Sequence, residues 1–226
     1  MVFPKLKRGI FCKRLNRFLA EVELDGKICQ CHVKNTGRLG ELLIPGAEVW
    51  CEIHDDPARK TKYSLLLVRK GDRLVSIDSQ APNRLAFEYV QSGGLGTVPQ
   101  TVRREVTCGD SRFDLWFEQS GQPAWMEVKG VTLEEDGIAR FPDAPTERGA
   151  KHVRGLQRIA QEGGNAYVLF VIQMTGIRWF EPNEASDPEF AAALREAAES
   201  GVRILAVSCE VTLEGMKTAA PVEVRL

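Results

Sequence analysis

The chain has 226 residues, 43% of them hydrophobic and 27% charged, and its net charge at pH 7 is -1. These values are typical of a globular domain or two and exclude a disordered chain or a fibrous repeat. Because the net charge is near zero, contact with nucleic acid would depend on local clusters of lysine and arginine.

The N-terminal third of the sequence predicts short strands separated by turns. Residues 18–24 alternate between apolar and polar side chains and end at Asp25-Gly26, a hairpin turn. A short apolar stretch covers residues 39–44. Further strands are expected at residues 27–33, 47–53, 63–68 and 74–77. Short strands in such close succession favour a small barrel, and an OB-type barrel that binds nucleic acid is the natural candidate.

The strand pattern breaks near Ala81-Pro82-Asn83, which predicts an OB-type domain over residues 1–82 and a second domain over 83–226. Asn83 is expected to cap a helix over residues 84–91. Strands are predicted at residues 102–108, 112–118, 124–131, 166–173 and 202–207, and helices at 146–162, with Thr146 as its N-cap, and at 187–200. This alternation predicts an α/β domain with a mixed sheet.

Two of these strands carry the residues most suggestive of chemistry. A hairpin centred between Ser120 and Gly121 places Asp114 opposite Glu127, and Lys129 on the same face as Glu127. Directly opposed residues lie about 4.5–5.5 Å apart at Cβ, so the two carboxylates would repel unless a cation or a proton lies between them.

Paired carboxylates are typical ligands of Mg²⁺ or Mn²⁺, which would act here on a phosphodiester. Lys129 is expected to orient water or offset negative charge, and Glu88 is a candidate third carboxylate from the helix. The catalytic candidates are therefore Asp114, Glu127, Lys129 and Glu88, with Asp114 and Glu127 as metal ligands. The alternative is a polar strand face without a metal, on which such a spacing arises by chance.

Basic and polar residues near the expected barrel and active site are candidates for binding DNA, with RNA as the alternative. They are Lys13, Arg14, Arg17, Lys34, Asn35, Thr36, Arg38, Arg59, Lys60, Lys62, Arg112, Arg148, Lys151 and His152. The alternative is a solvated charged surface, with His152 as a structural histidine and residues 35–37 as a simple turn.

The six cysteines form no Cys-x-x-Cys pair, so we expect reduced thiols and no zinc. No apolar run approaches the roughly 18 residues that a membrane span needs. We therefore expect a cytoplasmic protein with no membrane partner.

Several longer motifs resemble the sugar fermentation stimulation protein A family over nearly the whole chain. They are Asn35-Thr36-Gly37, Pro82-Asn83-Arg84-Leu85, Ser111-Arg112-Phe113-Asp114, the stretch 127–133 (EVKGVTL) and the stretch 141–152 (FPDAPTERGAKH).

The resemblance implies an N-terminal OB-type domain and a C-terminal domain of the PD-(D/E)xK nuclease fold. It also implies DNA binding without sequence specificity and a role in regulating sugar catabolism, notably that of maltose. The ligands of that fold would fall on Asp114 and Glu127, its lysine on Lys129 and its helix acid on Glu88. One departure is Phe113, where the wider nuclease motif has proline.

Two functions remain open from the sequence. One is a Mg²⁺-dependent nuclease, supported by the set of carboxylates and lysine. The other is a DNA-binding regulator that keeps the nuclease fold without catalysis. A sugar-metabolising enzyme is a weaker alternative, because the sequence contains no phosphate-binding glycine loop and no nucleophile motif.

Overall fold

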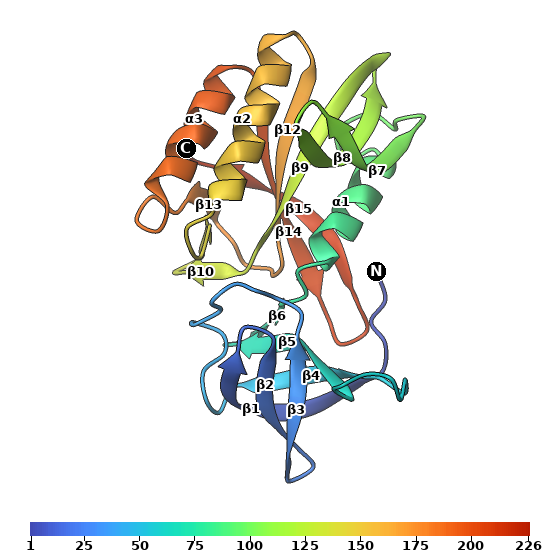
Figure 1. The fold of residues 1–226 in the computed structure, drawn as a ribbon, viewed down its shortest axis with the longest axis vertical. Helices are drawn as coiled ribbons and strands as arrows, with labels where there is room; N and C mark the ends of the chain where they lie inside the picture. Colours follow the sequence, from blue (N-terminus) through green and yellow to red (C-terminus); the bar gives the residue numbers. More distant parts are fainter.

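The computed structural model describes residues 1–226 as two domains, a barrel and a larger α/β domain, stacked along the long axis of the molecule (Figure 1). The barrel precedes helix α1 in the chain, and the α/β domain follows from it. No helix is long and apolar enough to cross a membrane. All six cysteines are free thiols.

The first domain is a closed barrel. Its strands are β1 (Leu6–Asn16), β2 (Leu19–Leu24), β3 (Lys27–Val33), β4 (Glu48–Ile53), β5 (Tyr63–Lys70) and β6 (Arg73–Ser76). They form a 6-stranded sheet in the order β3-β2-β1-β4-β5-β6, and an additional parallel pairing of β3 with β5 closes it. Alternate residues such as Val22 and Leu65 point inward and are fully buried. The expected OB-type barrel is confirmed.

Two local features of the barrel were not predicted from the sequence. The strand β1 was not expected, because its many lysines and arginines mask the alternation that buries Phe11. The apolar stretch at residues 39–44 is a turn and not a strand. It buries Leu39, Leu42 and Leu43 against the barrel core without joining the sheet.

The second domain is built on one mixed sheet. Its strands are β7 (Val102–Cys108), β8 (Ser111–Gln119), β9 (Gln122–Val131), β10 (Leu133–Glu135), β11 (Ile138–Phe141), β12 (Asn165–Ile172), β13 (Trp179–Pro182), β14 (Arg203–Val211) and β15 (Met216–Val224). The 9-stranded order is β10-β11-β13-β15-β14-β12-β9-β8-β7. The central strand β12 runs parallel to both β9 and β14, and the hairpins β7-β8-β9 extend the sheet antiparallel.

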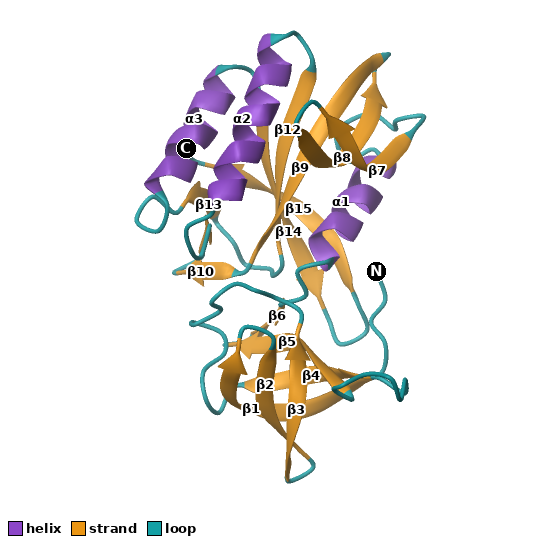
Figure 2. Cartoon of the chain, in the orientation of Figure 1, coloured by secondary structure: helices purple, strands orange, loops and turns teal.

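Helices cover both faces of this sheet (Figure 2). Helices α2 (Glu147–Gln161) and α3 (Pro188–Glu199) lie side by side on one face, and α1 (Ala81–Gln91) lies on the other. Thr146 caps α2 as expected, and Asp187 caps α3, each through its side-chain oxygen. The short strands β10, β11 and β13 and the largely exposed β15 were not predicted, because none carries a continuous apolar pattern.

Two features at the domain boundary differ from the sequence-based expectation. Helix α1 begins at Ala81, with Pro82 in its first turn, so Asn83 lies inside the helix and does not cap it. The first three residues of the chain pair with the α/β domain: Val2 forms a bridge with Gly215, and the backbone N–H of Phe3 donates to Glu214.

Candidate functional site

The predicted register of the β8–β9 hairpin is confirmed. Trp116 pairs with Trp125 and Leu115 with Met126. The ladder of paired residues ends there, one pair short of Asp114 and Glu127. The two acids therefore lie where the strands stop pairing, next to each other but outside the regular ladder.

Strand β8 changes the face that it presents at Asp114. The ring of Phe113 packs in the core beneath α2, 6.3 Å from the ring of His152, whereas Leu115 belongs to the core beneath α1. Residues two apart in a regular strand share one face, so the strand turns over at the residue between them. The neighbouring strand shares the irregularity, because Glu105 has a φ of 55° and is skipped in the pairing of β7 with β8.

Asp114 is held by partners on both sides of the strand. Its Oδ1 accepts a hydrogen bond from Asn83 Nδ2 of α1 at 2.7 Å, and its Oδ2 accepts one from the backbone N–H of Val128 at 2.8 Å. Burial, and then the negative charge of Glu127, raise the pKa of Asp114 above its ordinary value. The carboxylate form of Asp114 is thus destabilised until a cation compensates its charge.

Glu127 is only 3% exposed and has two partners on a single oxygen. Its Oε1 lies 2.6 Å from His152 Nδ1 and accepts from Lys129 Nζ, also at 2.6 Å. Burial raises the pKa of Glu127, but the hydrogen bond from His152 and the charge of Lys129 outweigh burial and bring the pKa below its usual range. Its other oxygen, Oε2, is buried and has no hydrogen-bond partner.

These features fit a divalent cation. The Oε2 atom of Glu127 is buried without a partner, and the neighbouring Asp114 has a raised pKa, so a cation between them would stabilise both; carboxylate oxygens are the ligands that Mg²⁺, Mn²⁺ and Ca²⁺ prefer. The chain contains no group of three or more His, Cys, Asp or Glu side chains placed to hold a metal ion. Asp114 and Glu127 would therefore share the ion with backbone carbonyls, water or substrate.

Glu88, the expected third carboxylate, lies elsewhere. Its side chain pairs with Arg84 at 3.0 Å and with the N-terminal ammonium group of Met1 at 3.4 Å. Asn83 is the α1 residue that reaches Asp114. The sequence did not reveal this contact, because an asparagine at an apparent helix start is more simply explained as a cap.

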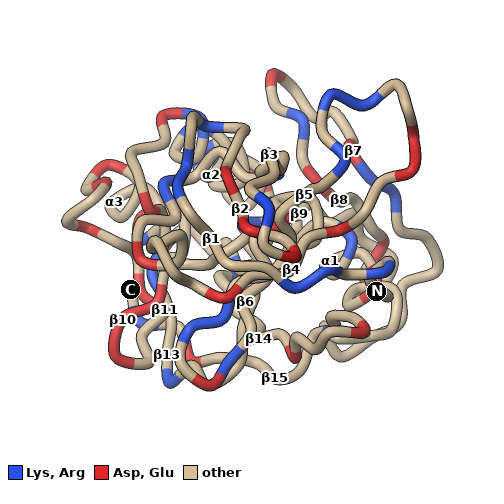
Figure 3. The backbone as a smooth tube through the Cα atoms, turned by 90° about the horizontal axis from the view of Figure 1, so that it is seen from below, with Lys and Arg blue, Asp and Glu red and all other residues tan.

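The predicted nucleic-acid-binding residues divide into two groups. Arg14 is a structural clamp: its guanidinium donates to the backbone carbonyls of Gly37 at 2.6 Å and of Arg17, Asn35 and Arg38 at 2.8 Å each. Lys34 pairs with Glu52 at 2.7 Å, and His152 is buried beside Glu127. The remaining charged candidates are exposed: Lys13, Arg17, Arg38, Arg59, Lys60, Lys62, Arg112, Arg148 and Lys151. Lysine and arginine alternate with acidic residues over the face seen in Figure 3 and form no single patch.

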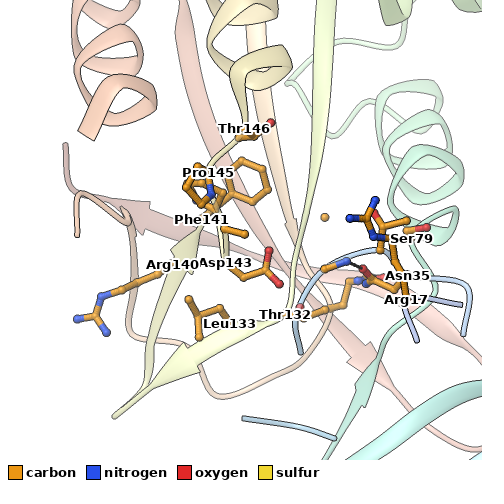
Figure 4. Close-up of a pocket in the computed structure, with 16 residues that line it drawn as sticks. Arg17, Asn35, Ser79, Thr132, Leu133, Arg140, Phe141, Asp143, Pro145 and Thr146 are labelled. Atoms are coloured by element: carbon orange, nitrogen blue, oxygen red, sulfur yellow. Dashed lines mark hydrogen bonds between the residues drawn. The ribbon is translucent and has the colours of Figure 1, made fainter. Parts of the chain in front are cut away.

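A cleft of about 420 Å³ separates the two domains (Figure 4). The barrel contributes Arg17, the predicted residues Asn35 and Thr36, and Gly37. The α/β domain contributes residues 140–146 and the end of β9. Asp143 crosses the domain boundary, because its Oδ2 accepts from the backbone N–H of Arg38 at 2.8 Å. A Cβ on Gly37 would lie 2.6 Å from the same oxygen, so a larger residue at this position would displace the Asp143 carboxylate.

Comparisons with known proteins agree with this architecture. Residues 12–77 match the family model described as "SfsA N-terminal OB domain", and residues 80–215 match "Sugar fermentation stimulation protein RE domain". The sugar fermentation stimulation protein homolog of Desulfitobacterium hafniense (strain Y51) is 48% identical over 226 residues, covering 100% of this chain and 99% of the relative. The homolog of Ruminiclostridium cellulolyticum is 47% identical over 226 residues and covers 100% of both chains.

A solved structure of Pyrococcus furiosus SfsA in complex with Ca²⁺ has a TM-score of 0.90 and 30% sequence identity to this chain, covering 100% of this chain and 98% of that one. Fold and site together define a two-domain protein in which an OB barrel is joined to a mixed-sheet domain with a buried and a half-buried acid on neighbouring strands. The chain belongs to the sugar fermentation stimulation protein (SfsA) family.

Proposed function

We propose that this protein binds DNA with little sequence preference and cleaves it with the help of a divalent cation held by Asp114 and Glu127. The observation that carries the proposal is the unpartnered buried oxygen of Glu127 beside an acid whose pKa is raised. A polar strand face without a ligand has no reason to bury a carboxylate oxygen in this way, because leaving it unpaired destabilises the fold.

The surrounding residues have distinct roles in this proposal. Asn83 and the backbone of Val128 fix the orientation of Asp114, and His152 fixes that of Glu127. Lys129 Nζ lies at the site with its side chain 14% exposed, where it would stabilise negative charge developing on a phosphate. A divalent cation bound there would neutralise the two acids and polarise the phosphodiester.

The comparisons support parts of this proposal. The solved SfsA of Pyrococcus furiosus was obtained in complex with Ca²⁺, another divalent cation with a preference for oxygen ligands. The barrel has the OB fold, which in many proteins binds single-stranded nucleic acid. The family name links the protein to sugar fermentation, and we extend this to a regulatory role in sugar catabolism, including that of maltose, exercised through DNA.

One observation favours a DNA-binding regulator without catalysis. Lys129 already forms an ion pair with Glu127 at 2.6 Å, so the buried glutamate is partly neutralised without a metal. In this second proposal, the acids stabilise the fold and the exposed arginines and lysines bind DNA.

A cleavage assay separates the two proposals. Single-stranded, duplex and branched DNA and RNA are incubated with the protein in Mg²⁺, Mn²⁺ or EDTA. The Asp114→Asn variant is compared with Glu118→Gln, a matched change at an acid of the same strand whose side chain forms no hydrogen bond. Metal-dependent cleavage that Asp114→Asn loses and Glu118→Gln retains supports the nuclease. Binding without cleavage on every substrate supports the regulator.

A further inference from the structure

The cleft between the domains contains a polar group that the nuclease proposal does not use. Gln173 follows β12 directly and is 1% exposed. Gln173 is one of the residues that line the cleft, its Oε1 is buried without a partner, and its Nε2 lies beside Gly130, where a Cβ would be 3.6 Å away. An unpaired buried amide is unfavourable in the free protein, which indicates that a ligand completes its hydrogen bonds.

The rest of the cleft offers complementary chemistry. Leu133 and Pro145 provide an apolar wall, and Asp143 faces Arg17 from the opposite side (Figure 4). The guanidinium of Arg17 forms no ion pair and is exposed. Arg140, the other arginine of the cleft, is engaged by Glu135 and Glu181 at 2.8 Å each. A fitting ligand has a flat apolar body, a hydrogen-bonding edge for Gln173 and one anionic group for Arg17, which describes a nucleotide.

The position of the cleft links it to the candidate metal site. Gly130 and Thr132 line the cleft; Gly130 is the next residue after Lys129, and Thr132 lies two residues beyond it. At about 3.3 Å per residue, Lys129 and Thr132 are separated by roughly 10 Å. A nucleic-acid strand with a phosphate at Asp114, Glu127 and Lys129 would reach the cleft if it ran along β9 toward Thr132.

We propose that the interdomain cleft binds one unstacked nucleotide of a single-stranded substrate, next to the phosphodiester held at Asp114 and Glu127. The inference rests on the proposed nuclease function and adds the class of substrate. A volume of about 420 Å³ accepts one nucleotide and not a base pair. A base can enter it only when it is unpaired.

The test measures binding in EDTA, where no cleavage interferes. Fluorescence anisotropy is recorded with labelled single-stranded DNA, single-stranded RNA, an abasic strand of the same length and a hairpin whose loop is a linker without bases, so that every base is paired. The variants are Gln173→Met, which keeps the shape of the side chain but removes its amide, and Arg17→Gln. Gln122→Met, an exposed position at the other end of β9, is the matched control.

We expect the wild-type protein to bind a strand with bases more tightly than the abasic strand and the hairpin. Gln173→Met should weaken binding of the base-containing strand about tenfold, as for the loss of one buried hydrogen bond, and leave binding of the abasic strand unchanged. Arg17→Gln should weaken binding of both strands. Gln122→Met should change the binding of neither strand. The unfolding midpoint of Gln173→Met should equal or exceed that of the wild type, because an unpaired buried amide is removed.

Equal affinity of Gln173→Met and wild type for the base-containing strand would overturn the proposal, as would tighter binding of the hairpin. The nucleotide site and the nuclease proposal can fail independently, and the experiments tell the two failures apart. If Asp114→Asn abolishes cleavage while Gln173→Met changes nothing, the nuclease stands and the nucleotide site falls. If no substrate is cleaved but Gln173→Met loses base-dependent binding, the nucleotide site stands alone.

Discussion

His152 Nδ1 lies 2.6 Å from Glu127 Oε1, and this contact joins helix α2 to strand β9 inside the protein. Both residues are buried, with exposures of 8% for His152 and 3% for Glu127. This contact keeps Oε1 occupied and leaves Oε2 as the free oxygen, so it determines which atom of Glu127 is available to a cation.

Replacing His152 by alanine should therefore destabilise the protein. Glu127 would lose one of its two partners while remaining buried, at a cost of about 1–3 kcal/mol in the free energy of unfolding. Chemical denaturation of His152→Ala measures this loss. The control is His32→Ala, at a partly exposed histidine of the barrel. Equal stability of His152→Ala and wild type would show that the contact contributes nothing.

Lys129→Ala should separate catalysis from binding. The ammonium group is at the candidate metal site, but the exposed arginines and lysines that would bind DNA lie elsewhere. We expect cleavage to fall by about 10²–10³-fold, the usual effect of removing one group that stabilises the transition state. DNA affinity in EDTA should change less than twofold. A variant that cleaves as fast as the wild type would remove Lys129 from the mechanism.

The basic residues near the end of β1 should behave differently from one another. Lys13→Gln and Arg17→Gln should each flatten the slope of log affinity against log salt by about 1 if they contact phosphates. Arg14→Gln should instead lower the free energy of unfolding by about 1–3 kcal/mol, because it leaves backbone carbonyls of the loop at residues 35–38 without their donor. If Arg14→Gln flattened the salt slope at unchanged stability, the clamp assignment would be wrong.

The contact between the domains should weaken in acid. Buried Glu134 of β10 pairs with Lys70 of β5 at 2.8 Å. Burial raises the pKa of Glu134, but the hydrogen bond from Lys70 and that from the backbone of Gly137 outweigh burial and lower the pKa below the ordinary value for glutamate. A carboxylate with a lowered pKa adds stability above its unfolded pKa of about 4.3 and loses it as the pH falls through the folded value.

We therefore expect Glu134→Gln to be less stable than wild type at neutral pH and to lose less stability between about pH 5 and pH 3, the range in which most glutamates of folded proteins titrate. Thermal unfolding across this range measures the difference. Parallel pH profiles for the two proteins would contradict the assigned role of this ion pair.

The sequence predicted the elements in which pattern and packing agree. The alternation of residues 18–24, the register of Trp116 with Trp125 and the Thr146 cap were all readable, because each depends on neighbours close in the chain. The change of face of β8 at Asp114 could not be predicted from the sequence, because it arises from packing of Phe113 and Leu115 against different helices.

The candidate site shows the same limit. Asp114, Glu127 and Lys129 were found from their spacing on one hairpin. Asn83 and Gln173 were missed because their importance depends on contacts between segments far apart in the chain. An unpartnered buried oxygen is a property of the folded protein, and no pattern of residues in the sequence predicts it.

The central claim is that Asp114 and Glu127 hold a divalent cation, and titration with Mn²⁺ tests it most directly. Calorimetry at neutral pH compares wild type with Asp114→Asn and with the Glu118→Gln control. We predict one ion bound by wild type and control, none by Asp114→Asn, and tighter binding as the pH rises, because the raised pKa of Asp114 makes protons compete with the metal. Equal Mn²⁺ binding by wild type and Asp114→Asn would contradict the account.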